Sequence, residues 1–301
     1  MAAKKDIILA VIIITSVAVF GFMFLFVVLG SFIGEDLDIS AGLGERIAVI
    51  ELRDAIYDSR DIVRQLKKYG ENGDIPAILL HIDSPGGAVV PSMEIYEEIL
   101  KLREETGIVV VASFASVAAS GAYLIACGCD TIVSHPGSIT GSIGTVLSYP
   151  VASGLLDKVG VQYEVIKSGE YKDVGNWARS VTPKERKMLQ NLIDDSYRQF
   201  ADIVSENRGI PLMELIRISQ GQIYTGAQAK ELGLVDVLGN YYDAVDLTAE
   251  MAGIEGEPKT VREIKRRRPS FWDIFTDGLA LLRDVTEEHK RTGPQLEYIM
   301  K

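Results

Sequence analysis

The chain has 301 residues, 47% of them hydrophobic, enough for one large domain or two ordinary ones. Its formal net charge of -11 at pH 7 argues against nucleic acid as a partner. The only cysteines, Cys127 and Cys129, are too close in sequence for a good disulfide and have no matching histidine cluster for a zinc site. We interpret them as small core residues. The sequence contains no G-x-x-x-x-G-K-[ST] phosphate loop for a nucleotide. We expect that no metal, nucleotide or other cofactor is needed.

The first 34 residues are predicted to form a cytoplasmic stub and a transmembrane anchor. Lys4 and Lys5 precede an uncharged apolar run, residues 7–30, which would span about 36 Å as a helix. The positive flank predicts a cytoplasmic N-terminus in a single-pass cell-membrane protein, with the remainder of the chain outside the cytoplasm. A cleaved signal peptide is the alternative, although the run is long for one and no clear cleavage site follows it. Residues 35–45 are the expected linker.

Residues 46–254 are predicted to form an α/β domain. Strands are expected at residues 46–52, 77–82, 108–114, 130–134, 145–148, 163–167 and 222–224. Helices are expected at residues 59–69, 92–105, 118–127, 152–159, 182–207, 212–219, 227–232 and 242–251. The succession of strand, turn, helix and strand indicates a largely parallel, buried sheet.

Residues 255–301 differ in composition and are predicted to be a C-terminal extension. Residues 262–268 are mostly basic in an otherwise acidic chain. Residues 270–284 carry two adjacent aromatic residues and an apolar stripe. This segment could lie on a membrane surface, or dock on its own subunit or a neighbour, and the sequence leaves both readings open.

Ser120 stands between a predicted buried strand and a helix of small residues. A serine at such a turn meets the outward-pointing N–H groups of a helix start, which favour developing negative charge. It is a candidate nucleophile. By itself the pattern is more typical of a helix cap or a small packing residue.

A serine nucleophile needs a base to take its proton. The histidines are His81 in a strand pattern, His135 before a proline, and His289 in the charged tail; none has an obvious orienting carboxylate. A buried lysine can lose its charge near neutral pH, and Lys172 lies in a glycine-containing turn after a predicted strand. A solvated surface lysine is the alternative interpretation.

Two further turns carry suitable chemistry. Residues 83–87, Asp-Ser-Pro-Gly-Gly, end a strand with consecutive glycines that could present N–H groups to an oxyanion. Residues 140–142, Thr-Gly-Ser, offer a hydroxyl that could hold a lysine amine in place. Each could equally be an ordinary turn.

Together the motifs DSPGG (83–87), ASGAY (119–123), TGSIG (140–144) and KSGEYKD (167–173) resemble the signal peptide peptidase SppA (protease IV) family over about residues 46–250. Members are serine peptidases of the ClpP/crotonase superfamily with a Ser–Lys dyad. The resemblance implies the following roles: nucleophile Ser120, general base Lys172, lysine-holding hydroxyl Ser142, and oxyanion N–H groups of Gly87 and Gly121.

The resemblance also implies a superhelix of repeated ββα units and assembly of one-unit chains into a homo-oligomer, possibly an octamer, with sites shared between protomers. Expected partners are membrane lipid and apolar peptides, including cleaved signal peptides. Two other functions stay open at this stage. One is a crotonase-type acyl-CoA enzyme on the same fold, and the other is a catalytically silent membrane scaffold.

Overall fold

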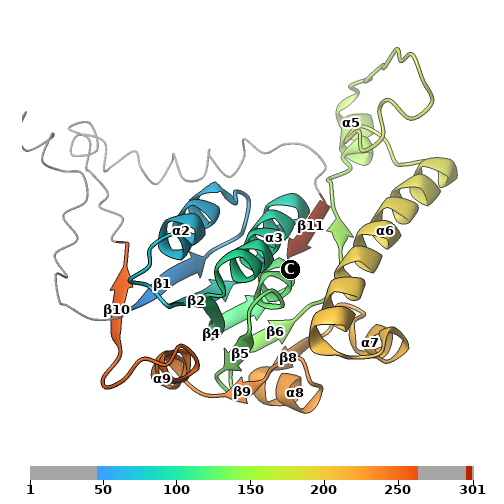
Figure 1. Cartoon of the computed structure of the whole chain (residues 1–301). Helices are drawn as coiled ribbons and strands as arrows, with labels where there is room; N and C mark the ends of the chain where they lie inside the picture. Colours follow the sequence, from blue (N-terminus) through green and yellow to red (C-terminus); the bar gives the residue numbers. More distant parts are fainter. Residues whose placement is uncertain (1–45, 264–295, 300–301) are drawn as a thin grey trace, which may run out of the picture. The chain divides into compact units, whose positions relative to one another are not determined.

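The computed structural model describes residues 46–263 and 296–299 (Figure 1). The strands are β1 (Arg46–Arg53), β2 (Ala77–Ser84), β3 (Gly86–Ala88), β4 (Val109–Ala119), β5 (Thr131–Ser134), β6 (Ile139–Gly141), β7 (Val146–Leu147), β8 (Ile223–Thr225), β9 (Val237–Leu238), β10 (Lys259–Arg262) and β11 (Leu296–Ile299). The helices are α2 (Arg60–Gly70), α3 (Val89–Thr106), α4 (Gly121–Ala126), α5 (Ser153–Val159), α6 (Pro183–Arg208), α7 (Leu212–Ile218), α8 (Gly226–Glu231) and α9 (Tyr241–Met251).

The main sheet is mixed. Its central path runs β10-β1-β2-β4-β5-β9, with every neighbouring pair parallel. The carboxyl-terminal end of β4 also pairs in parallel with β6, and β6 pairs antiparallel with β8. A second sheet has the order β3-β11-β7, with both pairings antiparallel. The predicted α/β class and the largely parallel main sheet are confirmed.

The two faces of the main sheet are covered by different helices. Alternate residues of a strand point to opposite faces, so β1 and β2 each contribute to two cores. Ile50 and Leu80 pack in the larger core, and Val49 and Leu79 in the smaller one. Helices α2 and α3 lie on one side of the strands and α9 on the other (Figure 1). Because helices cover both faces of the sheet, its central strands are apolar on both sides.

Most predicted helices and strands are present as expected. The long helix α6 has the clearest sequence signals at its two ends. Thr182 caps α6 through a capping box with Glu185, Pro183 is its first residue, and Gly209 ends it in a left-handed conformation (φ 63°).

Cys127 and Cys129 are buried free thiols, as expected of core residues, and burial raises the pKa of Cys127 to about 12.

The predicted strand at residues 163–167 is wrong. That segment has no ladder partner among the described strands and is largely exposed, with the Tyr163 ring resting 5.8 Å from that of Trp177. The predicted helix at 118–127 begins only at Gly121, because β4 continues to Ala119. Strands β3, β6, β9, β10 and β11 were not predicted.

No helix within residues 46–263 or 296–299 is long and apolar enough to cross a membrane. The predicted stub, anchor and linker at residues 1–45, and the segment 270–284, lie outside the described residues. The superhelix of repeated ββα units and the division of the chain at residues 34, 45 and 254 stay predictions.

Candidate active site

Ser120 occupies the one-residue turn between β4 and α4. Its backbone has φ 54° and ψ -119°, a conformation that suits glycine and is strained for a residue with a side chain. The Ser120 N–H donates to the carbonyl of Gly141 at 2.8 Å, which ties the turn to β6. The predicted strand-to-helix turn is thus confirmed. Strain of this kind gathers where a side chain is held in place for a function.

The Ser120 hydroxyl is buried and has no hydrogen-bond partner among the described residues. It is the one side-chain polar atom of the described residues in that state. The residue is 1% exposed. An unsatisfied buried hydroxyl costs about 1–3 kcal/mol, so a partner from outside these residues would be stabilising.

Ser142 lies next to Ser120. Strands β4 and β6 run parallel with Ala119 paired to Gly141, so each serine is one residue beyond a paired position. Ser142 also has a positive φ, 51°, and its N–H donates to the Gln222 carbonyl at 2.7 Å. The structure therefore brings together two of the predicted site residues that are 22 positions apart in sequence.

Gly87 is positioned by a close approach between two backbones. It forms an isolated parallel bridge with Ile56, whose N–H donates to Gly86 and whose carbonyl accepts from Ala88. A Cβ on Gly87 would lie 2.0 Å from the Ile56 oxygen, so only glycine fits. Gly87 is therefore required by the close packing against the Ile56 backbone, in addition to its predicted role as an oxyanion donor.

The side chains of Ser84, which is buried, and Asp83, which is exposed, brace the same turn. The Ser84 hydroxyl donates to the Asp54 carbonyl at 2.5 Å and accepts from the Gly86 N–H at 3.2 Å. The Asp83 carboxylate accepts from the Val117 N–H of β4 at 3.2 Å. Sequence reasoning missed these supporting roles of Ser84 and Asp83, although both residues stand inside the DSPGG motif.

Gly121 is the first residue of α4 and directly follows Ser120. The two predicted oxyanion donors thus lie at the start of a helix and in a short strand. Gly87 lies in β3, and helix α4 contacts that strand.

Lys172 has a different setting. It is exposed, in the turns that follow α5, and its side chain makes no hydrogen bond or ion pair to another described residue. Figure 1 shows α5 near the start of α6 and away from β4. Since Ser120 has no hydrogen-bond partner among the described residues, the chain does not join these two predicted dyad members itself.

A charged network holds the turns around Lys172. The Arg179 guanidinium bridges Asp173 and Glu185, with nitrogen–oxygen distances of 2.7 and 2.6 Å, and Lys167 binds Asp173 at 2.6 Å. Hydrogen bonds from Arg179 lower the pKa of Glu185 to about 2 and hold that of Asp173 well below its ordinary value. The network fastens these turns to the start of α6. The sequence offered only the charge clustering as a signal.

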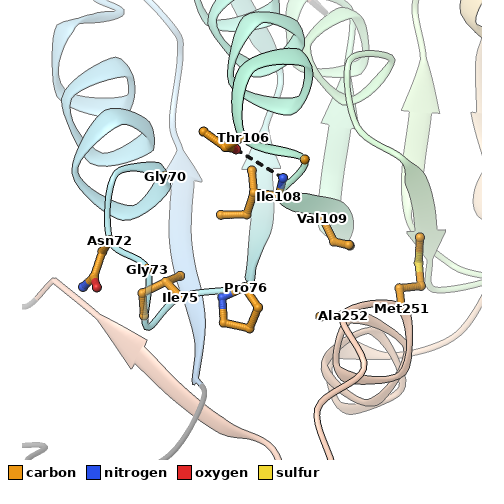
Figure 2. A pocket seen from close by; sticks show the side chains of 11 residues that line it. Gly70, Asn72, Gly73, Ile75, Pro76, Thr106, Ile108, Val109, Met251 and Ala252 are labelled. Carbon is orange, nitrogen blue, oxygen red and sulfur yellow. Dashed lines mark hydrogen bonds between the residues drawn. The ribbon is translucent and has the colours of Figure 1, made fainter.

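A pocket of about 280 Å³ adjoins the Ser142 turn. Its lining includes Ser142, Thr145 and Val146, together with Tyr197 of α6. A second pocket, of about 420 Å³, lies by the amino ends of β2 and β4, near Pro76 and Val109 (Figure 2). Ser120 follows the carboxyl end of β4, and no predicted site residue lines this second pocket.

The described histidines are engaged elsewhere. His81 Nδ1 is 3.4 Å from the Ser113 hydroxyl and its ring packs edge-on against Tyr241; burial lowers its pKa. His135 Nδ1 accepts from the Gly137 N–H at 3.1 Å. His289 lies outside the described residues. Within those residues, no group of three or more histidine, cysteine or acidic side chains is arranged to bind a metal ion.

The chain is similar to two known protease families. The family model of peptidase family S49 matches residues 103–255, and that of Clp protease matches residues 38–136. A Synechocystis protein named as a candidate protease is 44% identical over 226 residues, covering 75% of this chain and 81% of its own length. Protease 4 of Salmonella typhi is 31% identical over 234 residues, 75% of this chain and 38% of the relative.

A chloroplastic serine protease SPPA of Arabidopsis thaliana is 31% identical over 220 residues, which cover 72% of this chain and 32% of the relative. The S49 match contains Ser120, Ser142 and Lys172, and the Clp protease match contains Gly87. The chain is therefore a serine peptidase that belongs to peptidase family S49, the SppA family.

Proposed function

We propose that the chain is a membrane-anchored endopeptidase whose nucleophile is Ser120 and whose general base is Lys172 of a neighbouring protomer. The observation that carries the proposal is the buried Ser120 hydroxyl, which has no partner among the described residues. It stands on a strained turn beside Ser142 and α4. A base supplied by another protomer would complete the site.

The setting of Lys172 supports a base supplied in this way. Its side chain is exposed and unpaired among the described residues, while its neighbours Lys167 and Asp173 are held in the charged network. Because the charged network already orders the turns around Lys172, binding of this lysine in a neighbouring protomer's site would cost little backbone conformational entropy. We therefore propose a homo-oligomer, possibly an octamer, in which each site draws on two chains.

The proposed reaction is acyl transfer to serine. Neutral Lys172 Nζ takes the Ser120 proton as Oγ attacks the peptide carbonyl carbon. The N–H groups of Gly87 and Gly121 bind the resulting oxyanion. When the tetrahedral intermediate collapses, the carbon–nitrogen bond breaks and Lys172 gives the proton to the leaving amine. Water, activated by the same lysine, then attacks the acyl-enzyme and releases the second product. The Ser142 hydroxyl holds the amine of Lys172.

The proposed substrates are apolar peptides near the membrane, including remnant signal peptides. Two observations support this: the apolar run at residues 7–30 and an Enterococcus faecium relative named as a candidate signal peptide peptidase SppA, 36% identical over 190 residues. The anchor would keep the peptidase domain close to substrates released in the bilayer. The S49 match favours a peptidase over the acyl-CoA enzyme considered above.

Active-site labelling of the purified full-length chain tests the proposal. A fluorophosphonate should modify Ser120, located by peptide mass spectrometry, and Ser120→Ala should abolish the label. Ser116→Ala is the matched control, because Ser116 lies exposed on the same strand, β4. The control should keep full labelling and full hydrolysis of a fluorogenic apolar peptide. Labelling that persists in folded Ser120→Ala would refute the nucleophile.

A further inference from the structure

The Arg179 guanidinium binds two carboxylates, each through a pair of hydrogen bonds. Its Nε and Nη2 donate to Asp173 at 2.8 and 2.7 Å. Its Nη1 and Nη2 donate to Glu185 at 2.8 and 2.6 Å. Two paired contacts of this kind fix the plane of the guanidinium as well as its position, which the point charge of a lysine does not do. Arg179 is therefore a rigid link between the two acidic residues.

One end of this link is anchored in the domain. The Glu185 side chain is 1% exposed and also accepts the Thr182 N–H at 2.8 Å, as part of the capping box of α6. Further along the same helix, Phe200 and Val204 pack in the larger core. Because α6 is fixed in this way, Glu185 gives Arg179 a stationary anchor.

The other end of the link lies beside the proposed base. Asp173 directly follows Lys172 in the chain and also accepts from Lys167 Nζ at 2.6 Å. Lys167 Nζ donates in addition to the Glu170 carbonyl at 2.8 Å, which closes the segment of residues 167–173 on itself. We call this segment the base loop. Of its four charged side chains, that of Lys172 alone has no ion pair within the part of the chain that the structure describes.

We propose that Arg179 is a positioning residue for catalysis, which holds the base loop through Asp173 so that the Lys172 amine meets Ser120 of a neighbouring protomer. The inference rests on the proposed function. A general base must come within about 2.6–3.2 Å of the group whose proton it takes, and a misplacement of about 1 Å costs about 10²-fold in rate. Arg179 itself would touch neither the substrate nor the reacting atoms.

The charges of the network suit this role. The two cations, Arg179 and Lys167, balance the carboxylates of Asp173 and Glu185, so the network brings no net charge to the base loop. Hydrogen bonds from Arg179 lower the pKa of both carboxyl groups, which keeps them ionised and engaged. An Asp173 carboxylate released from Arg179 could pair with the Lys172 ammonium instead and favour the charged form, which cannot accept a proton.

Removal of the guanidinium should lower kcat and leave KM nearly unchanged, because the base is displaced while peptide binding is not. We expect Arg179→Ala to reduce kcat about ten- to a hundredfold. Arg179→Lys keeps the charge without the paired contacts and should recover only part of this loss. Arg186→Ala is the matched control, since Arg186 is exposed in the first turns of α6 and its side chain forms no ion pair with a described residue. An unaltered kcat in folded Arg179→Ala, or full activity in Arg179→Lys, would overturn the inference.

A double-mutant cycle tests whether Arg179 acts through Asp173. Asp173→Ala should lower kcat as Arg179→Ala does. The double variant should be no slower than the slower single variant, because the second change removes a contact that is already lost. Reductions that multiply in the double variant would show that the two residues act independently and would rule out the proposed route.

Hydrogen exchange and oligomer size give readouts that need no catalysis. Arg179→Ala should exchange faster than Arg186→Ala at residues 167–173 alone, and it should form oligomers of unaltered size. Faster exchange throughout the domain, or smaller oligomers, would assign Arg179 to folding or assembly and sink the positioning role.

Lys172→Ala separates this inference from the proposed function. If folded Lys172→Ala keeps full activity, Lys172 is not the base and the proposed function fails. If Lys172→Ala is inactive while Arg179→Ala keeps the unaltered kcat, only the role of Arg179 is refuted.

Discussion

Ser120 and Ser142 each stand one residue beyond a paired position of two parallel strands, and both have positive φ angles, 54° and 51°. Two such residues side by side cost roughly 1–3 kcal/mol each. Backbone hydrogen bonds hold them there, one from the Ser120 N–H to the Gly141 carbonyl and one from the Ser142 N–H to the Gln222 carbonyl. This pairing sets the two hydroxyl-bearing residues at one edge of the sheet.

Removing the Ser142 hydroxyl should weaken catalysis without abolishing it. The hydrogen bond it is proposed to make to the base contributes about 1–3 kcal/mol, so Ser142→Ala should lower kcat/KM by about five- to 150-fold. Ser142→Gly, which suits the positive φ, should show the same loss. Recovery of activity in the glycine variant would instead assign the effect to the backbone.

Ser120→Gly should separate stability from activity. Glycine adopts φ 54° and ψ -119° freely, so this variant should exceed Ser120→Ala in free energy of unfolding by about 1–3 kcal/mol. Both variants should be inactive. Denaturant unfolding of the two folded variants measures the difference. If the alanine variant proves as stable as the glycine variant, the Ser120 turn stores no strain.

Gly87→Ala should damage catalysis through the backbone. The added Cβ would meet the Ile56 oxygen at 2.0 Å, so β3 must move away from Ile56 and carry its N–H group with it. Displacing one oxyanion donor lowers kcat by about 10²- to 10³-fold. Gly73→Ala is the matched control, since nothing lies within 4 Å of its Cβ. Comparable kcat values for the two variants would exclude Gly87 from the site.

Acid should release the network that braces the turns around Lys172. The pKa of Glu185 falls from 4.5 to about 2 on folding, so its stabilising contribution is complete above about pH 4.5 and is lost as pH falls through 2. Thermal unfolding of the unaltered chain and Glu185→Gln should therefore differ near pH 6 and converge towards pH 2. A difference in Tm that stays constant over this range would contradict the assignment.

The sequence predicted the features that depend on residues close together in the chain. A strand followed by small residues located the Ser120 turn, and Thr182, Pro183 and Glu185 located the start of α6. Residues 163–167 have strand-like composition, yet they lack a neighbouring strand among the described residues, and composition alone cannot supply one.

Features that depend on contacts between segments far apart in the sequence could not be predicted. Strand β3 exists because Ile56 and β11 flank the two glycines, and β11 comes from more than 200 positions away in sequence. The resemblance to the family motifs pointed to Lys172, whereas charge clustering alone could not show that Arg179 braces the surrounding turns. The proximity of Ser120 and Ser142 likewise depends on the pairing of β4 with β6.

Complementation between two inactive variants tests whether each site is shared by two protomers. Ser120→Ala and Lys172→Ala chains should each be inactive alone, because each lacks one member of the dyad. Co-expressed under two tags and purified as mixed oligomers, some interfaces will pair an intact Ser120 with an intact Lys172. Activity should return in proportion to those interfaces, reaching about a quarter of the unaltered level for random mixing of equal amounts, because each residue is intact in half of the chains.

The control is a mixed oligomer of the unaltered chain with the double variant Ser120→Ala, Lys172→Ala. Random mixing again leaves about a quarter of shared sites intact, whereas sites within single chains would keep about half. The two mixtures should therefore have equal activity if sites are shared. If instead the single-variant mixture is inactive while the control keeps about half, each chain holds its own dyad, and Lys172 must approach Ser120 by a movement within one protomer.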